Sequence, residues 1–353
     1  ADVHILSRRS STGGGGSMYY LEFIGMGEFE DLVFEYEYVS SQSETDDERR
    51  KALLKLIKAG IIQYYSQAGL MDQIELDFNG NGNKMAVEPM DDPWNLWVFS
   101  LRAGIDFEME ESQNEYSFNS ELGIEKVTEA WKTELEANYN IYYENYFDDG
   151  EEIVNKQNDT RVTYDYIRSL NPKWSTGLLS NYISRTYMNV KNNYGLSAGV
   201  EYNIFPWDIS NRKVFTFRYE AGVSSYDYNE ITIYNKMNEV LLFEALSLNF
   251  RFDQPWGSLE TSIRGSHYFY DFSKNMLTID SDFRVRLTKQ LSIYGEIETR
   301  VIHDQLYLPI GDASLEDVLL ERRKLATTYE ISGDFGFRFT FGSKYNNVVN
   351  ERF

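Results

Sequence analysis

The sequence predicts an all-β fold: a transmembrane antiparallel β-barrel of about twelve strands, preceded by a small α+β domain. Three observations support this fold class. Twelve segments between residues 97 and 341 alternate apolar and polar residues with a period of two. All six tryptophans fall at one end of the strands that this alternation defines. The chain also lacks a run of about 18 uncharged apolar residues, so no transmembrane helix is expected.

The composition narrows the class of protein further. Aromatic residues make up 16% of the 353 residues, a share that is normal where aromatic belts lie at two membrane interfaces. The net charge of -22 leaves no basic stripe for phosphates, so nucleic acid is not expected as a partner. Without cysteine the chain can form neither a disulfide nor a thiolate metal site, and no cofactor is expected. The chain starts at Ala1 in what reads as the middle of a strand, so we expect residues upstream of it.

The first 80 residues predict a separate domain with the order β-β-β-α-β, which we expect in the periplasm. Its strand candidates read VHIL, YYLEFIG, LVFEYEYV and QIELDF. Thr45 and Glu48 have the spacing of a capping box, and they begin an amphipathic pattern that ends before Gly69. A linker at 81–93 leads to the barrel at 94–342, and 343–353 form a C-terminal extension.

Each of the twelve segments has one apolar face and one polar face. The last segment reads YEISGDFGFRFTF, with aromatic and aliphatic residues at alternate positions. The segment lengths match the roughly 9–11 residues that a tilted strand needs to cross a bilayer, and their number is even, as in single-chain bacterial barrels. The predicted strands are 97–108, 116–125, 131–141, 160–168, 174–187, 194–204, 214–224, 242–252, 258–270, 277–287, 291–301 and 329–341.

Tryptophan marks one rim of the predicted barrel. If the first strand runs outward from the periplasm, every tryptophan lies at the periplasmic rim, while the connections at the other rim are long, acidic and rich in tyrosine. A soluble β-sandwich has no reason to sort tryptophan in this way, so we expect the bacterial outer membrane and its lipid as surroundings. The expected membrane-interface belt consists of Trp94, Trp97, Trp131, Trp174, Trp207 and Trp256.

The polar faces of the strands carry charges of both signs and predict a charge network in the lumen. Its expected members are Arg102, Arg218, Glu220, Arg264, Asp280, Asp282, Arg284, Arg286, Glu296, Glu298, Arg300 and Arg338. We expect opposite charges on neighbouring strands to pair, as Arg284 and Arg286 could with Glu296 and Glu298. A structural plug of ion pairs is the favoured interpretation, and an eyelet that selects solutes by charge is the alternative.

Catalytic and metal-binding candidates are few. An outer-membrane lipase would need a nucleophile beside a histidine. Ser266 and His267 are adjacent, so on a strand they point to opposite faces, although a serine of a neighbouring strand could still reach His267. The acidic residues at 148–152 offer oxygen ligands but lack EF-hand spacing. We therefore expect neither an enzyme nor a metal site. The histidines are His4, His267 and His303.

The connection at 303–328 is the longest at the tyrosine-rich rim. Within it, SLEDVLLERRKL has capping-box spacing and predicts a short helix. An ordered surface loop is the favoured interpretation, and a segment that folds into the mouth of the barrel or projects as a contact surface is the alternative.

Several stretches carry a resemblance to known proteins. FRFTF is similar to the C-terminal aromatic signal by which outer-membrane proteins are recognised for insertion, although this chain continues to Phe353. DDPWNLWVF, VEYNIFPW, QPWGSLETSIRGSHY, DQLYLPIG and FGSKYNNVVNERF resemble an uncharacterised family of Gram-negative outer-membrane β-barrel proteins with an N-terminal periplasmic domain. The resemblance implies a location and a fold, and it implies no activity.

Three functions compete. The first is a structural or scaffolding subunit of an envelope assembly for export, insertion or surface attachment, which binds protein partners through the N-terminal domain and the outer loops. The second is a narrow channel for small solutes, and the third is a lipid hydrolase. The additional domain favours the first function, because a simple diffusion pore does not need it.

Overall fold

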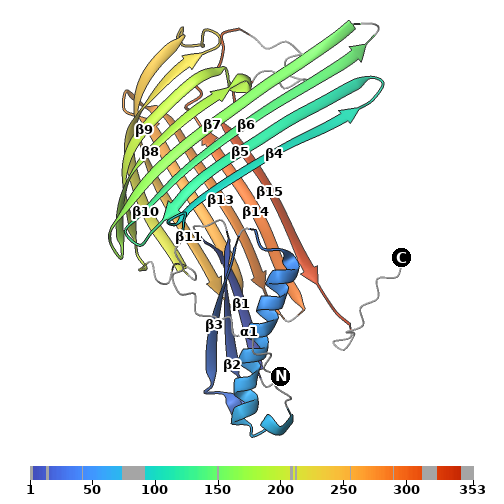
Figure 1. Ribbon diagram of the computed structural model, residues 1–353. Coiled ribbons are helices and arrows are strands. Elements are labelled where there is room, and N and C mark those ends of the chain that lie inside the picture. Colours follow the sequence, from blue (N-terminus) through green and yellow to red (C-terminus); the bar gives the residue numbers. More distant parts are fainter. Residues whose placement is uncertain are drawn as a thin grey trace.

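The structure is a computed structural model that describes residues 3–12, 16–41, 43–73, 92–148, 151–206, 210, 213–254, 256–288, 290–311 and 324–342. It contains a twelve-stranded antiparallel sheet that curls into a barrel, and a three-stranded sheet with a long helix beneath one end of that barrel (Figure 1). The predicted all-β class and the predicted number of barrel strands are confirmed.

The small sheet has the order β1-β2-β3, and all its neighbours are antiparallel. Its strands are β1 (Val3–Ser11), β2 (Ser17–Gly25) and β3 (Val33–Ser40). Helix α1 (Asp46–Gln67) begins with the predicted capping box, in which Thr45 and Glu48 each bond the backbone N–H of the other. The expected fourth strand, QIELDF, begins at Gln73 in the short 3-10 helix η2 (Met71–Gln73), and the rest of it lies outside the described residues.

The helix covers this sheet through a small core of Leu21, Phe23 and Tyr64. The Tyr64 hydroxyl donates to the carbonyl oxygens of Phe23 at 2.8 Å and Leu32 at 2.9 Å, so its polar end is satisfied. Gly60 lies directly over the Phe23 ring, and a Cβ at that position would come within 2.3 Å of the ring. The close approach of helix and sheet therefore requires glycine here.

Each barrel strand pairs with the next one along the chain. The strands are β4 (Trp97–Met109), β5 (Gln113–Val127), β6 (Trp131–Asp148), β7 (Glu151–Asn171), β8 (Trp174–Arg185), β9 (Val190–Asn203), β10 (Lys213–Tyr228), β11 (Asn238–Gln254), β12 (Gly257–Tyr268), β13 (Asp271–Arg286), β14 (Leu291–Ile302) and β15 (Tyr329–Phe339). The first and last strands, β4 and β15, are the two edges of the sheet, and no ladder joins them in the described part of the chain.

Several strands extend beyond the predicted alternating segments, and β6 and β7 extend furthest. The acidic stretch expected as a loop after residue 141 instead continues the β6–β7 ladder as far as the pair Asp148 and Glu151. Beyond the hydrocarbon, water solvates both faces of a strand, so the apolar alternation can stop while the backbone pairing continues. The pattern alone therefore marks the lipid-facing part of the strand and not its end.

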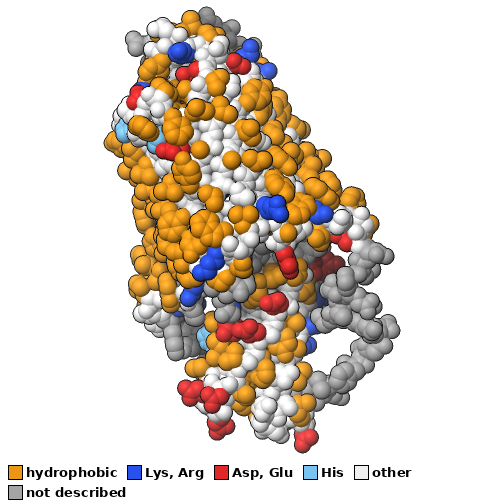
Figure 2. Space-filling model, turned by 90° about the vertical axis from the view of Figure 1, so that its left-hand side faces the viewer, with side chains coloured by type: hydrophobic (Ala, Val, Ile, Leu, Met, Phe, Trp, Pro, Cys, Tyr) orange, Lys and Arg blue, Asp and Glu red, His pale blue; other side chains and the backbone are white. Residues whose placement is uncertain are grey.

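The registers place the apolar residues of all twelve strands on one continuous outer face. On the first two strands, Leu101 lies opposite Leu122 and Ile105 lies opposite Phe118. Figure 2 shows that hydrophobic side chains dominate this face on one side of the barrel. Among the described helices, none combines the length and apolar character needed to cross a bilayer.

The tryptophans collect at one end of the barrel, here called the tryptophan rim. Trp97, Trp131 and Trp174 open β4, β6 and β8, whereas Trp94 and Trp256 immediately precede β4 and β12. Strands with even labels all start at this end because successive strands are antiparallel. Lys126 lies between two of the indoles, with its Nζ 5.7 Å from the centre of the Trp97 ring and 5.5 Å from that of Trp131. Trp207 lies outside the described residues.

Candidate functional site: a chamber in the barrel mouth

The opposite end of the barrel, the loop rim, contains a cavity of about 850 Å³. We call this cavity the chamber. Strands β6 to β10 and β12 to β15 contribute to its wall, together with the short 3-10 helix η3 (Thr186–Met188) and residues that follow β14. Its aromatic lining consists of Tyr142, Tyr187, Tyr226, Tyr228, Tyr268 and Tyr307, and its charged lining of Asp159, Arg161, Arg185, Arg300, Asp304, Lys324 and Glu330.

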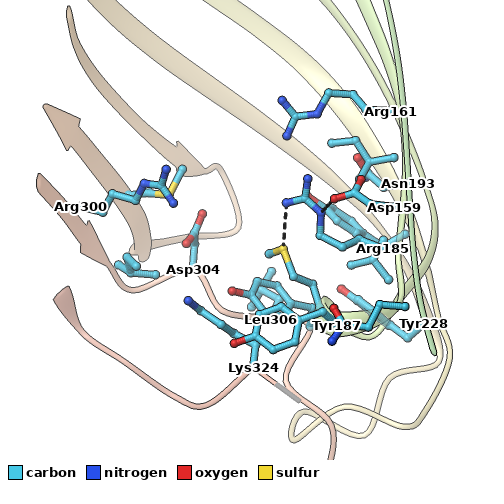
Figure 3. Close-up of a pocket in the computed structure, with 18 of the residues that line it drawn as sticks. Asp159, Arg161, Arg185, Tyr187, Asn193, Tyr228, Arg300, Asp304, Leu306 and Lys324 are labelled. Atoms are coloured by element: carbon cyan, nitrogen blue, oxygen red, sulfur yellow. Dashed lines mark hydrogen bonds and ion pairs between the residues drawn. The ribbon is translucent and has the colours of Figure 1, made fainter. Parts of the chain in front are cut away.

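One wall of the chamber presents two arginines. Asp159 and Arg161 are successive inward residues of β7, and Arg185 ends β8 opposite Asp159 in the ladder. Arg185 Nε lies 2.6 Å from Asp159 Oδ2. Arg161 forms no ion pair with any residue that the structure describes, and Figure 3 shows it extending from the same wall as Asp159 and Arg185. Among the described residues of this wall, its guanidinium is therefore a cation without an ion-pair partner.

The facing wall combines two cations with two carboxylates. Arg300 Nη1 lies 3.7 Å from Glu330 Oε2, and Lys324 Nζ bonds the same carboxylate. Asp304 follows the end of β14, and Figure 3 shows its side chain beside that of Arg300, across the cavity from Arg161. Burial raises the pKa of Asp304 to about 6, although a hydrogen bond to its own backbone and the neighbouring His303 act in the opposite direction.

The chain after β14 folds over the chamber. Ile233 N–H donates to the Leu308 carbonyl oxygen at 2.9 Å, and Ile310 N–H donates to that of Ile231 at 2.8 Å. Thr232 and Leu308 are buried in this contact. Residues 303–310, here called the cap, therefore fold over the mouth of the barrel. Most of the helix expected from SLEDVLLERRKL lies outside the described residues.

Asn189 fastens the cap to two other connections. Its side-chain amide donates to the carbonyl oxygens of Tyr307 at 2.9 Å and Glu230 at 3.1 Å, and its Oδ1 accepts from Glu230 N–H at 2.7 Å. The residue has a φ of 57°, in the left-handed region that asparagine tolerates better than most residues. A turn of this shape directs the buried amide towards the cap.

Part of the predicted lumen network forms ion pairs. Arg264 pairs with Glu220, and Arg102 Nη1 lies 3.3 Å from Glu121 Oε2. Arg218 lies opposite Glu201 in the β9–β10 ladder. Arg300 also pairs with Glu298 on its own strand. These side chains lie on the inward face that the alternation predicts.

The pairs expected between β13 and β14 do not form among the described residues. Asp280 and Asp282 lie opposite Glu298 and Glu296, so carboxylates face carboxylates. The arginines lie nearer the tryptophan rim, where Arg284 is opposite Tyr294 and Arg286 is opposite Ser292. Ser292 is in turn opposite Arg338 on β15. The hydrogen-bond register, which the sequence pattern leaves undetermined, separates these charges.

The partners of His267 and His303 in the described part of the chain are a carboxylate and an amide. His267 lies on the outward face, with Nε2 2.9 Å from Glu244 Oε1, and the Tyr219 hydroxyl donates to the same carboxylate. In the described part of the chain no serine hydroxyl bonds His267. His303 Nδ1 lies 3.1 Å from Asn275 Oδ1 at the loop rim. His4 lines a second cavity, described next.

A second cavity, also of about 850 Å³, separates the small domain from the tryptophan rim. Arg8 and Glu22 line it from β1 and β2, and Asp253, Trp256 and Arg284 line it from the barrel. Residues of the small sheet thus face the β11–β12 junction and the adjacent ends of β13 and β14 across this cavity.

The sequence did not identify Arg161, Arg185, Asp304 or Lys324 as site residues. The first two lie in the strands with the least regular alternation, and the other two lie in a connection. The available signal was the tyrosine-rich rim, since several of those tyrosines line the chamber.

Comparisons with known proteins found solved structures with a similar fold. No family model matches the chain, and no curated protein matches it. A NanC porin structure is 12% identical, with a TM-score of 0.34, and the match covers 67% of this chain and 100% of the porin. The CymD monoaromatic hydrocarbon channel is 7% identical, with a TM-score of 0.31 and coverage of 97% and 87%. The β domain of the Bordetella autotransporter BrkA is 11% identical, with a TM-score of 0.27 and coverage of 69% and 98%.

Proposed function

We propose that this protein is an outer-membrane channel for small polar solutes, with the chamber as its selective part. The chamber carries the proposal, because it places an available arginine, a carboxylate and several tyrosines around a space of about 850 Å³ inside a barrel wall. Fixed polar and charged groups can replace part of the water that a solute loses on entering a narrow passage. A purely structural plug of ion pairs has no need of such a space.

The two walls would act on a solute in different ways. Arg161 offers a planar set of donors to a carboxylate, a phosphate or a hydroxyl group. Asp304 and Glu330 on the facing wall attract donors, and the tyrosines provide ring faces and hydroxyl groups. The cap, held by Asn189, would narrow the entrance and set the upper size of the solute.

We also propose that the tryptophan rim faces the periplasm and that the small domain lies there beneath the barrel. The chain belongs to an uncharacterised family of Gram-negative outer-membrane barrels that carry such a domain. The sorted tryptophans and the stretches from DDPWNLWVF to FGSKYNNVVNERF support these two assignments.

Planar-bilayer recording tests the channel. We expect resolved conductance steps from the purified protein, and we expect Arg161→Glu to shift the reversal potential in a salt gradient towards cation selectivity. Val162→Ala is the matched control, because Val162 is the next residue of β7 and points outward. A folded protein that conducts no current in any salt, or an unchanged reversal potential in Arg161→Glu, would contradict the proposal.

A scaffolding role is the second candidate, and the small domain supports it. Leu54 on α1 is 43% exposed and lies in a shallow groove with Leu53, Ile57 and Tyr19. An envelope protein bound there should be recovered from native membranes in mild detergent with the unaltered chain and lost with Leu54→Glu. Lys58→Glu, an exposed change on the same helix, is the control. If the unaltered chain, Leu54→Glu and Lys58→Glu all recover the same amount of the bound protein, the groove is not its binding site.

A further inference from the structure

The two edge strands of the barrel are unusually exposed. Leu101 and Ile105 on β4 are 78% and 71% exposed, whereas their neighbours on β5, Leu122 and Phe118, are both 37% exposed. On the other edge, Phe337 of β15 is 71% exposed. Neither edge has a ladder partner on its free side among the described residues. In hydrocarbon, each unpaired backbone group costs several kcal/mol, so a stable barrel must pair these edges.

We propose that β4 and β15 pair with each other in one register, which places Arg102 opposite Asp334. The same register aligns the two ends of β15 with β4, because Trp97 then lies opposite Phe339 and Phe107 lies opposite Tyr329. The complete length of β15 (Tyr329–Phe339) finds a partner along β4 (Trp97–Met109).

Charge complementarity selects this register over its neighbours. Arg102 has a side chain that is 77% exposed and a single ion-pair partner in the described chain, Glu121. Asp334 has no ion pair with any described residue. A slip of two residues, the smallest that keeps the lipid face outward, would place Arg102 opposite Gly336 or Ser332. Of these three registers, only the proposed one places the two charges opposite each other.

The outward side chains match in the same register. Phe99 meets Phe337, and Ile105 meets Ile331, so large apolar groups cover the seam on the lipid side. On the lumen side Ser100 faces Gly336, and Gly104 faces Ser332, so small residues lie between the charged positions and leave room for the Arg102 side chain.

The parity of the strands favours the chain's own edge over a strand from another protein. With twelve strands, β4 and β15 are antiparallel, as are all other neighbours in the barrel. A single added strand would be parallel to one of the two edges, and that would be the barrel's only parallel junction. Direct closure needs no such junction.

Cysteine cross-linking tests the register, since the chain contains no cysteine of its own. Phe99→Cys is combined in turn with Phe337→Cys, Phe335→Cys and Phe339→Cys, all on the outward face. The full-length variants are inserted into lipid vesicles and oxidised by oxygen with copper phenanthroline. Opposite Cβ atoms lie about 5 Å apart, and a slip of two residues moves them a further 6–7 Å along the strand, which is too far for a disulfide.

We expect most of the Phe99→Cys/Phe337→Cys chains to form an intramolecular disulfide. The fraction of chains that form one should be at least about tenfold lower for each of the other two cysteine pairs. Heat-dependent gel mobility, measured before oxidation, restricts the comparison to folded barrels. A cross-link that is strongest with Phe335→Cys or Phe339→Cys would overturn the register. No intramolecular cross-link in any folded, inserted pair would overturn closure itself and would favour a partner strand at the seam.

A charge exchange tests the Arg102–Asp334 pair independently of the backbone. Arg102→Asp alone should lower the yield of the Phe99→Cys/Phe337→Cys disulfide, and adding Asp334→Arg should restore it. Arg338→Asp is the control and should leave the disulfide yield unchanged. Arg338 lies on β15, as Asp334 does, but it faces the uncharged Val98 in this register. Equal yields in all of these variants would overturn the assigned role of the pair.

Discussion

The side-chain amide of Asn189 donates to the backbone carbonyl oxygen of Tyr307 at 2.9 Å and thereby joins the start of β9 to the segment after β14. The two residues are 118 positions apart in the chain. The cap is held over the chamber by such single hydrogen bonds and a short backbone pairing, whereas the barrel wall is held by long ladders. Local opening should therefore begin at the cap.

Asn189→Asp should release the cap. The carboxylate keeps an acceptor and tolerates the left-handed backbone, but it loses both amide donors. Each lost hydrogen bond costs about 0.5–1.5 kcal/mol, so the loss of both costs about 1–3 kcal/mol and raises the open population by about 5- to 150-fold. Limited proteolysis within 303–310 should accelerate accordingly, and single-channel conductance should increase.

Asn229→Asp provides the control for that change. Asn229 lies in the connection that meets the cap and is exposed, so the same chemical substitution there should alter neither measurement. Equal proteolysis of the two variants would show that Asn189 does not hold the cap.

If the protein conducts ions as proposed, its ion selectivity should depend on pH through Asp304. Burial raises the pKa of this carboxyl group to about 6, so the group is mostly neutral at pH 5 and mostly charged at pH 7.5. Raising the pH adds a negative charge to the chamber and should shift the reversal potential towards cation selectivity, with a midpoint near pH 6. Asp304→Asn should abolish this step.

His303 adjoins Asp304 and requires its own control. His303→Asn should retain the step, with its midpoint displaced upward, because the imidazole lowers the pKa of Asp304. A step that persists in Asp304→Asn would contradict its assignment to Asp304.

Breaking the Arg264–Glu220 pair should destabilise the barrel. Glu220 is only 5% exposed, and Arg264→Met would leave its charge without the partner that offsets its burial. Removal of one partner from a buried pair costs about 3–5 kcal/mol, so the midpoint of thermal unfolding in detergent should fall clearly.

The double variant Arg264→Met/Glu220→Gln should recover most of that loss, because no buried charge remains. Arg338→Met is the control, since Arg338 is exposed and forms no ion pair with the described residues. A double variant as unstable as the single one would show that packing, and not charge, explains the effect.

Gly60→Val should destabilise the small domain without affecting the barrel. The new side chain would enter the space occupied by the Phe23 ring, and overpacking of this kind costs about 1–3 kcal/mol. Proteolysis of α1 in the full chain should accelerate while conductance is unchanged. Lys58→Val makes a similar helix substitution at an exposed position and should have a much smaller effect. Equal rates for the two variants would rule out the close approach to Phe23 as the cause.

The alternation predicted the barrel strands well because lipid and lumen impose opposite requirements on adjacent residues. It correctly predicted that Arg264, Glu220, Arg284 and Glu296 all point into the lumen. Arg264 and Glu220 form an ion pair, whereas Arg284 and Glu296 do not. The difference lies in the offset between strands, because a shift of two residues preserves the face of every side chain and changes every partner. A sequence pattern with a period of two carries no information about such a shift.

The sequence by itself determined the twelve barrel strands, the face on which each side chain lies, the tryptophan rim and the capping box of α1. These features depend on neighbours within one strand or one helical turn, so local patterns are sufficient. Only the tertiary structure decided that Arg161, Asp304 and Lys324 surround one chamber and that the cap folds over it. Those residues belong to segments far apart in the chain, and they meet because the curled sheet and the hydrogen bonds of Asn189 bring their connections together.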